Sequence, residues 1–248
     1  MTEYKAEKIL PYQREEKKGV QVRDMFDAIA KDYDRLNRIM TFGGIDKIWR
    51  KTAIRLVGEK KPRRVLDVAT GTGDLALYIH KSLNPEHITG IDLSEEMLSI
   101  ARTKAKNAGV AEKITFECQD CLNLSFSDAS FDAVTVAFGV RNFENIQQGI
   151  DEMFRVLAPN GILMVLELST PEKFPFKQFY RIYSGYVIPL LGKLFSKDKT
   201  AYQYLPRSIA AVPQGDKMLQ IFRNVGFENT RCMALTFGSC SIYLGEKR

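Results

Sequence analysis

Histidine and cysteine, the residues that most often bind metals or act as bases and nucleophiles, are scarce here: the 248 residues include two histidines and four cysteines. Cys118 and Cys121 form a Cys-x-x-Cys pair, but Cys232 and Cys240 lie too far apart to supply the second close pair of a zinc site. We therefore expect no metal site, and we interpret the cysteines as reduced cytosolic thiols.

Long apolar runs are absent as well. The most apolar stretch, YVIPLLGKLF, is interrupted by Pro189, Gly192 and Lys193, and no run approaches the roughly 20 residues that span a bilayer. The first residues mix charges and contain no apolar signal-peptide core. These absences argue against a membrane-spanning or secreted protein, and we expect a cytoplasmic one.

The rest of the composition is that of a globular protein, with 45% hydrophobic and 27% charged residues. From Arg64 onward, short apolar runs alternate with segments of helical spacing. This alternation predicts an α/β fold with a doubly wound, mostly parallel sheet, because parallel strands that are buried on both faces are continuously apolar. The predicted strands are 64–70, 87–93, 113–119, 131–139, 161–169, 230–235 and 240–246, and the predicted helices are 74–83, 95–109, 146–158 and 215–226.

Two segments fall outside this alternation. Residues 1–60 are predicted to be helical and to form a lid on a single α/β domain, residues 61–248. The alternation stops at Pro171 and resumes after Pro213, so residues 171–210 are interpreted as a helical insertion over the site. Ligands of such sheets bind beyond the carboxyl ends of the strands.

The stretch VLDVATGTGDLALY, residues 65–78, contains a glycine turn of the kind that holds dinucleotide phosphates, and Asp92 stands at the matching distance. However, Asp67 and Asp74 flank the turn, and a carboxylate about 5 Å from a phosphate costs a few kcal/mol. Two carboxylates beside the turn favour a positively charged ligand. They therefore argue against the interpretation of this turn as part of an NAD-binding module. S-adenosylmethionine, with an ammonium, a sulfonium and no phosphate, fits this charge.

The ends of the next two strands fit the same ligand. Asp92 is suited to the ribose hydroxyls, Asp120 to the adenine amino group, and the backbone N–H of Cys121 to a ring nitrogen. Residues 65–73, IDLS at 91–94 and QDC at 119–121 together resemble the class I S-adenosylmethionine-dependent methyltransferases, which implies a Rossmann-like sheet. The expected cofactor site consists of Asp67, Gly71, Thr72, Gly73, Asp92, Asp120, Cys121 and Ala137.

Three stretches narrow the resemblance: Tyr33–Trp49, Phe138–Asn145 and Arg155–Ser169. Together they resemble the demethylmenaquinone and demethylubiquinone C-methyltransferases, the UbiE/MenG family, over nearly the whole chain from about Val22. The chain departs from the family pattern at four positions. Ile45 stands where histidine is usual, Ala158 where lysine is usual, Asn160 where glycine is usual, and Ala137 where serine is frequent.

The resemblance implies methyl transfer to a ring carbon of a polyprenylated quinol in menaquinone biosynthesis. Ubiquinone biosynthesis, or another small phenolic substrate, is the alternative, because both quinol precursors carry a hydroxyl beside the acceptor carbon. Since the methyl of a sulfonium is already activated, catalysis needs alignment and a stabilised phenolate.

The expected catalytic residues lie beyond the fourth strand and on the lid. Neither His80 nor His87 should reach the site, so no histidine base is expected. Arg141 is expected to hold the phenolate oxygen, because its pKa above about 12 keeps it charged. Asn142 is expected to hydrogen-bond the second quinol oxygen, and Tyr33 to orient the substrate.

Nine aromatic and seven basic residues interleave in segment 171–207. Such a segment can bind single-stranded nucleic acid, dock on an anionic membrane, or cap the site with its aromatics packed inward. Methyltransferases of exocyclic amines in nucleic acids usually carry an Asn/Asp-Pro-Pro-aromatic turn, where this chain has Gly139-Val-Arg-Asn, so no nucleic acid is expected. Two interpretations remain: a cap alone, and a cap that also makes a peripheral membrane contact. A long apolar tunnel beneath the insertion would distinguish a prenylated substrate from a soluble one.

Overall fold

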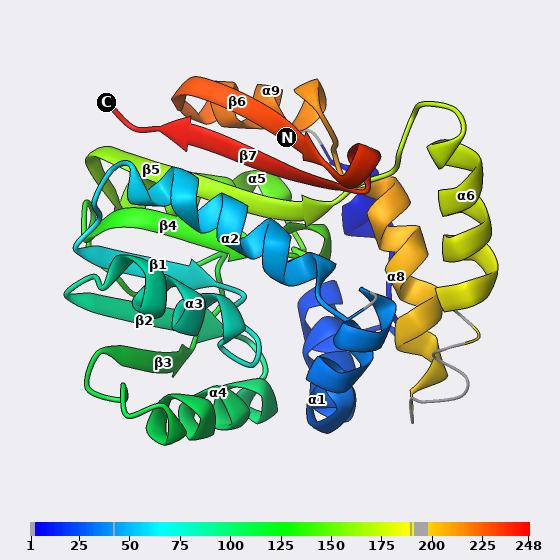
Figure 1. Ribbon diagram of the computed structural model, residues 1–248, viewed down its shortest axis with the longest axis horizontal. Coiled ribbons are helices and arrows are strands. Elements are labelled where there is room, and N and C mark those ends of the chain that lie inside the picture. The colour runs from blue at the N-terminus through cyan, green and yellow to red at the C-terminus, as the bar shows by residue number, and fades with distance from the viewer. Residues whose placement is uncertain (1–2, 42, 189, 191–197) are drawn as a thin grey trace.

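The computed structural model describes residues 3–41, 43–188, 190 and 198–248. Its centre is a seven-stranded sheet in the order β3-β2-β1-β4-β5-β7-β6 (Figure 1). The first five strands are parallel, and β7 runs antiparallel to both β5 and β6. The strands are β1 (Arg64–Val68), β2 (His87–Asp92), β3 (Ile114–Cys118), β4 (Phe131–Ala137), β5 (Leu157–Leu168), β6 (Glu228–Leu235) and β7 (Cys240–Glu246). The predicted fold class is confirmed.

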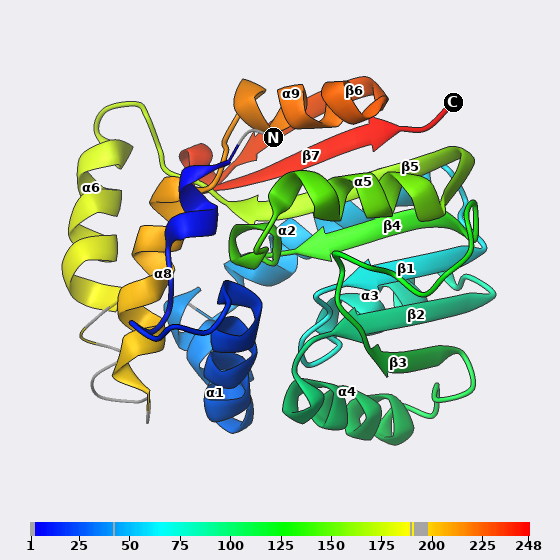
Figure 2. The ribbon, with the colours of Figure 1, turned by 180° about the vertical axis from the view of Figure 1, so that it is seen from behind.

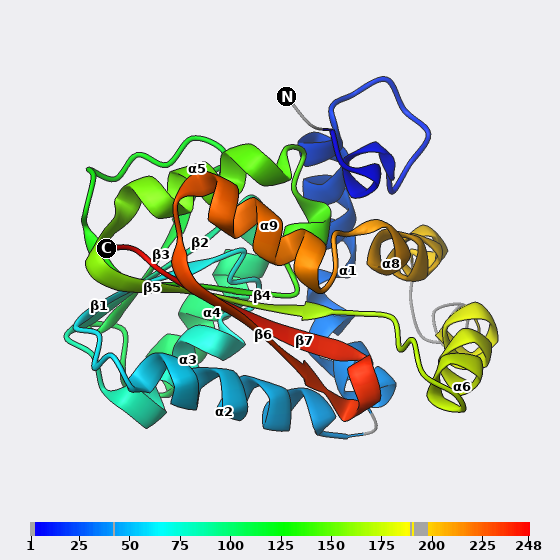
Figure 3. The ribbon, with the colours of Figure 1, turned by 90° about the horizontal axis from the view of Figure 1, so that it is seen from above.

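Helices cover both faces of the sheet. On one face lie α2 (Ile45–Gly58), α3 (Asp74–Leu83) and α4 (Glu95–Asn107), and on the other lie α5 (Ile146–Val156) and α9 (Asp216–Val225), as Figures 2 and 3 show. Val65, Leu66 and Val68 of β1 are fully buried, which is the result expected for a central parallel strand.

The boundary between α5 and β5 differs from the prediction. Leu157 pairs with Phe131 of β4, so the strand begins at Leu157 instead of residue 161. The register shifts between Phe131 and Ala133, and the Pro159–Gly161 stretch lies inside the strand. The predicted helix therefore ends at Val156 rather than residue 158.

A separate group of helices lies beyond the carboxyl ends of the parallel strands: α1 (Lys18–Met40), α6 (Phe176–Ile182) with the π-helical segment η3 (Tyr183–Val187), and α8 (Lys199–Ala211) (Figure 1). Of the residues expected to form a lid, α1 lies here, whereas α2 packs on the sheet with Ala53 and Val57 fully buried. In the part of the chain that is described, no helix is long and apolar enough to cross a membrane.

Candidate active site

The glycine turn after β1 is tied to the end of β2. The backbone N–H of Gly71 donates to Asp92 Oδ2 at 2.8 Å, and that of Ser94 donates to Oδ1 at 3.0 Å. Burial raises the pKa of Asp92, although these backbone donors oppose the shift. Gly71 has a φ of +56°, and the space that a Cβ would take is open. A ligand can therefore approach the backbone closely at this point.

A small cavity of about 80 Å³ lies beside this turn. Five of the residues predicted to bind the cofactor line it: Gly71, Asp92, Asp120, Cys121 and Ala137. They end β2 and β4 or follow β1 and β3, so the cavity runs across four neighbouring strand ends.

Asp67 and Asp74 are not among the described residues that line this cavity. Asp67 is 1% exposed, and its two oxygens accept hydrogen bonds from Thr70 Oγ1 at 2.6 Å and Thr135 Oγ1 at 2.8 Å. Asp74 accepts from Lys104 Nζ at 2.7 Å. The role of Asp67 in cofactor binding stays a prediction. In the structure its carboxylate is hydrogen-bonded to the loop and to β4, and Lys104 compensates the charge of Asp74.

Thr72 and Gly73, whose cofactor binding also stays a prediction, have packing roles in the structure. Thr72 Oγ1 donates to Asp34 Oδ1 of α1 at 2.7 Å and accepts from Lys104 Nζ at 3.0 Å, which joins the lid to the glycine turn. At Gly73, a Cβ would lie 2.9 Å from the Cβ of Ala101, so glycine permits the close approach of α4.

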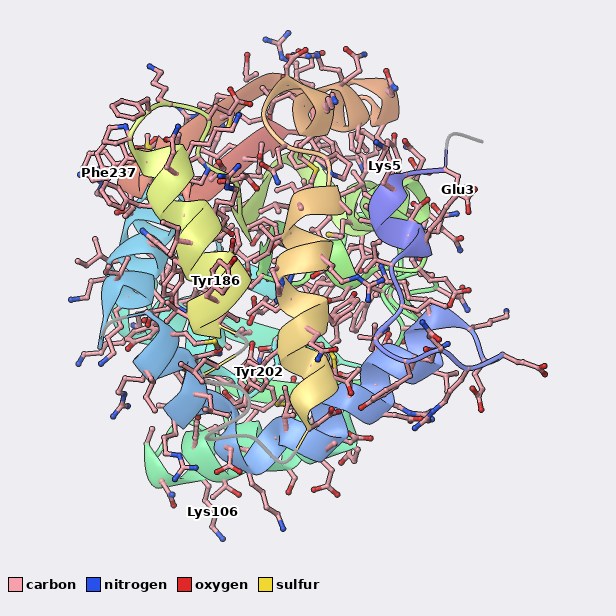
Figure 4. All side chains as sticks on the ribbon, turned by 90° about the vertical axis from the view of Figure 1, so that its right-hand side faces the viewer. Glu3, Lys5, Lys106, Tyr186, Tyr202 and Phe237 are labelled. Atoms are coloured by element: carbon pink, nitrogen blue, oxygen red, sulfur yellow. The ribbon has the colours of Figure 1, made fainter. Side chains whose placement is uncertain are left out.

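A larger cavity of about 470 Å³ lies beneath α1, α6 and α8, the helices that face the viewer in Figure 4. Most of its lining is apolar or aromatic, and the insertion contributes Phe176, Phe179, Tyr180, Tyr183, Ile188, Ala201, Tyr202, Tyr204, Leu205 and Ile209. Its volume is in the range typical of small-molecule sites. The insertion therefore covers an apolar cavity with its aromatic residues, and the long tunnel expected for a prenylated substrate stays a prediction.

The two cavities share one wall. Phe26 and Tyr33 of α1, and Phe138 and Asn142 from the segment after β4, line both of them. Tyr33 and Asn142, predicted as catalytic residues, thus stand where a ligand in one cavity meets a ligand in the other.

Arg141, the third predicted catalytic residue, lines the larger cavity and is 6% exposed. Its Nη1 donates to Glu167 Oε1 at 2.8 Å and to the carbonyl of Phe138, and its backbone N–H donates to Glu167 Oε2 at 3.2 Å. Its Nε has no hydrogen-bond partner. Burial is the largest influence on the pKa of Arg141 and lowers it, but the charge and hydrogen bond of Glu167, together with Tyr33 and Tyr204, outweigh burial and raise the pKa, so the guanidinium stays charged.

Glu167 was not singled out from the sequence. It lies near the end of β5, in LELS, so the argument used for Asp92 and Asp120, a carboxylate at a strand's carboxyl end, applied to it as well.

Asn142 is 9% exposed, and its Oδ1 accepts a hydrogen bond from Tyr204 Oη at 3.1 Å. Burial raises the pKa of Tyr204, and it raises that of Tyr180 to about 12. Both phenols are therefore neutral hydrogen-bond donors at physiological pH rather than bases.

Within the described residues, neither histidine, His80 or His87, lines either cavity. The four cysteines are free, and the described residues contain no cluster of side chains that could hold a metal ion.

The model of the ubiE/COQ5 methyltransferase family matches residues 13–247. The chain belongs to this family. The resemblance seen in the three sequence stretches is thereby confirmed.

The chain is 50% identical to a demethylmenaquinone methyltransferase of Bacteroides fragilis, over 98% of this chain and 99% of the relative. It is 48% identical to one of Porphyromonas gingivalis, over 97% and 98%. Among solved structures, the [4+2]-cyclase SpnF has a TM-score of 0.65 at 21% identity, covering 92% of this chain and 96% of that one. The last likeness concerns the fold.

The buried carboxylate of Asp67 generates a pH-dependent prediction. Burial raises its pKa to about 6, above the roughly 3.9 of an unfolded chain. The contribution of the neutral form to stability is fully present below pH 4 and is lost as pH rises through 6. The free energy of unfolding of the wild-type chain should therefore fall by about 2–3 kcal/mol between those pH values. In Asp67→Asn this fall should be absent.

Urea unfolding of the variant and of the wild-type chain between pH 4 and pH 7 measures this difference. Asp151→Asn, at an exposed position of α5, is the matched control and should keep the wild-type pH dependence. Parallel curves for Asp67→Asn and wild type would contradict the assignment.

Proposed function

We propose that this protein transfers the methyl group of S-adenosylmethionine to a ring carbon of a prenylated demethylmenaquinol. The observation that carries the proposal is the apolar cavity of about 470 Å³ that meets the cofactor cavity at a shared wall. An apolar cavity of this size suits a ring with a hydrocarbon tail. The relatives that carry the name demethylmenaquinone methyltransferase support this substrate over the ubiquinone precursor.

The residues of the small cavity suit this cofactor. Asp92 is proposed to accept from the ribose hydroxyls, Asp120 from the adenine amino group, and the open side of Gly71 to admit the ligand to the backbone. S-adenosylmethionine, when bound, supplies a methyl group that its sulfonium already activates.

The chain's own contribution is to align the acceptor ring and to ionise it. The charged guanidinium of Arg141, fixed by Glu167, lowers the pKa of a phenol held beside it and stabilises the phenolate. Electron density on the neighbouring ring carbon rises as a result. The phenol can then lose its proton at neutral pH without a histidine base.

Asn142 and Tyr33 orient the ring. The amide of Asn142 is held by Tyr204 and faces both cavities, which suits it to bind the second quinol oxygen. Tyr33 packs edge-on against Phe26, with ring centroids 6.0 Å apart, and closes the same wall from the lid.

Replacement of Arg141 tests the proposal. With saturating S-adenosylmethionine, Arg141→Ala should lower kcat for the reduced demethylmenaquinol by about 100-fold or more, as for the loss of one oxyanion-stabilising donor. Arg141→Lys keeps the charge but loses the planar guanidinium, so its kcat should lie between those of wild type and Arg141→Ala. Methyl transfer is measured with a radiolabelled methyl group, and the oxidised quinone should not react.

The exposed Arg223 of α9 gives the control, because Arg223→Ala should retain the wild-type rate. Binding of S-adenosylhomocysteine to each variant verifies that the fold is intact. Rates near wild type in both Arg141 variants, or equal reaction of the oxidised quinone, would refute the phenolate mechanism.

The outer side of the insertion supports a peripheral contact with the membrane that holds such a substrate. Ile182, Tyr186 and Leu190 follow one another at helical spacing and are 57%, 75% and 55% exposed. Tyr186, in the segment η3 that continues α6, is labelled in Figure 4. Exposed basic residues, Lys173, Lys177 and Arg181, flank this apolar stripe. An apolar face bordered by cations is suited to an anionic lipid surface.

Co-sedimentation with vesicles measures this contact. The wild-type chain should sediment with vesicles that contain anionic lipid at low salt, and the double variant Ile182→Asp/Tyr186→Ser should lose most of this binding. Met233→Ser, at a position 41% exposed on β6, is the control and should bind as wild type. Equal sedimentation of the double variant and wild type would exclude the stripe as the contact.

A further inference from the structure

Arg50 of α2 carries a buried charge that the described residues leave almost unpartnered. The residue is 8% exposed and lines the larger cavity, where its guanidinium lies 5.1 Å from the ring centroid of Phe138. Its nearest carboxylate is Asp46, with 3.8 Å between Nε and Oδ2. Arg50 Nε is buried without a hydrogen-bond partner.

A guanidinium has five N–H donors, and removing it from water is costly unless those donors are used. Arg50 makes no hydrogen bond to any described residue within normal limits. Asp46 is also engaged elsewhere, since its Oδ1 accepts from Thr41 Oγ1 at 2.9 Å. This arrangement points to an anionic ligand with two oxygens, the group that a guanidinium binds in a bidentate manner.

The strand order shows which part of the cofactor comes near Arg50. The strands lie in the order β3-β2-β1-β4, with neighbouring strands about 4.8 Å apart. With the adenine at Asp120 after β3 and the ribose at Asp92 in β2, the remaining amino-acid arm extends toward the ends of β1 and β4. Arg50 lies at those ends: it stacks on Phe138 after β4, and its charge opposes the raised pKa of Asp67 in β1.

We propose that Arg50 binds the carboxylate of the amino-acid arm of S-adenosylmethionine. This inference rests on the proposed function for the identity of the cofactor. The carboxylate is the cofactor's one anionic group, and Phe138, which lines both cavities, brings the guanidinium to the wall between them. Arg50, rather than Asp67, then supplies the charge that recognises this arm.

The test compares two ligands that differ in this carboxylate. S-adenosylhomocysteine and its decarboxylated analogue are titrated calorimetrically into the full chain, so the readout is binding and not turnover. Wild type should bind S-adenosylhomocysteine at least about 10-fold more tightly than the decarboxylated analogue, because a hydrogen bond to a charged group contributes about 1.5–3 kcal/mol. In Arg50→Gln this preference should fall below about 3-fold, through weaker binding of S-adenosylhomocysteine alone.

Arg55→Gln, at an exposed position on the same helix, is the matched control and should keep the wild-type preference. Arg50→Lys retains the charge and should keep part of the preference. Because Arg50 makes no hydrogen bond to the described residues and has only a long ion pair to Asp46, Arg50→Gln should melt no lower than wild type, which verifies its fold. Should Arg50→Gln keep the full preference, or weaken both ligands equally, the inference is overturned. If wild type binds neither ligand, the proposed function fails, and the inference fails with it.

Discussion

A buried ion pair between Arg141 and Glu167 fixes the segment on which the whole site depends. Three N–H groups donate to the Glu167 carboxylate: Arg141 Nη1 at 2.8 Å, the Arg141 backbone at 3.2 Å and the Leu168 backbone at 3.0 Å. Lys18 of α1 donates to the Arg141 carbonyl at 3.0 Å. These hydrogen bonds use both oxygens of the Glu167 carboxylate and so offset part of the cost of burying the pair, while Arg141 Nε stays without a partner. The pair therefore holds Asn142, the next residue, in the wall between the two cavities.

The charges of the site are divided between two buried arginines. Arg141 is paired with a carboxylate and faces the larger cavity, where a phenolate would form. Arg50 is paired more loosely, with Asp46 Oδ2 3.8 Å from its Nε, and lies over Phe138, toward the expected amino-acid arm of the cofactor. Between them the cavity lining is largely apolar, so each charge acts in a low dielectric. The division keeps one cation for the acceptor and one for the cofactor.

The sequence predicted the features that depend on local pattern. Apolar runs predicted the strands, and carboxylates at strand ends, such as Asp92, predicted residues that line the cofactor cavity. It could not predict contacts between distant segments: Thr135, which donates a hydrogen bond to Asp67, lies on another strand. Likewise, Arg50 was missed because α2 was expected in the lid, whereas it packs on the sheet and directs this side chain to the site. The aromatic content of the insertion predicted a cap, but not which rings face the cavity.

The central claim is that the methyl donor and the acceptor ring meet at the wall formed by Phe26, Tyr33, Phe138 and Asn142. A crystal structure with S-adenosylhomocysteine and a demethylmenaquinol that carries a short prenyl tail tests it most directly. The account predicts the ring at this wall, one ring oxygen within hydrogen-bond distance of Arg141, and the tail under α6 and α8. A ring bound outside this cavity, or with both oxygens directed away from Arg141, would contradict it.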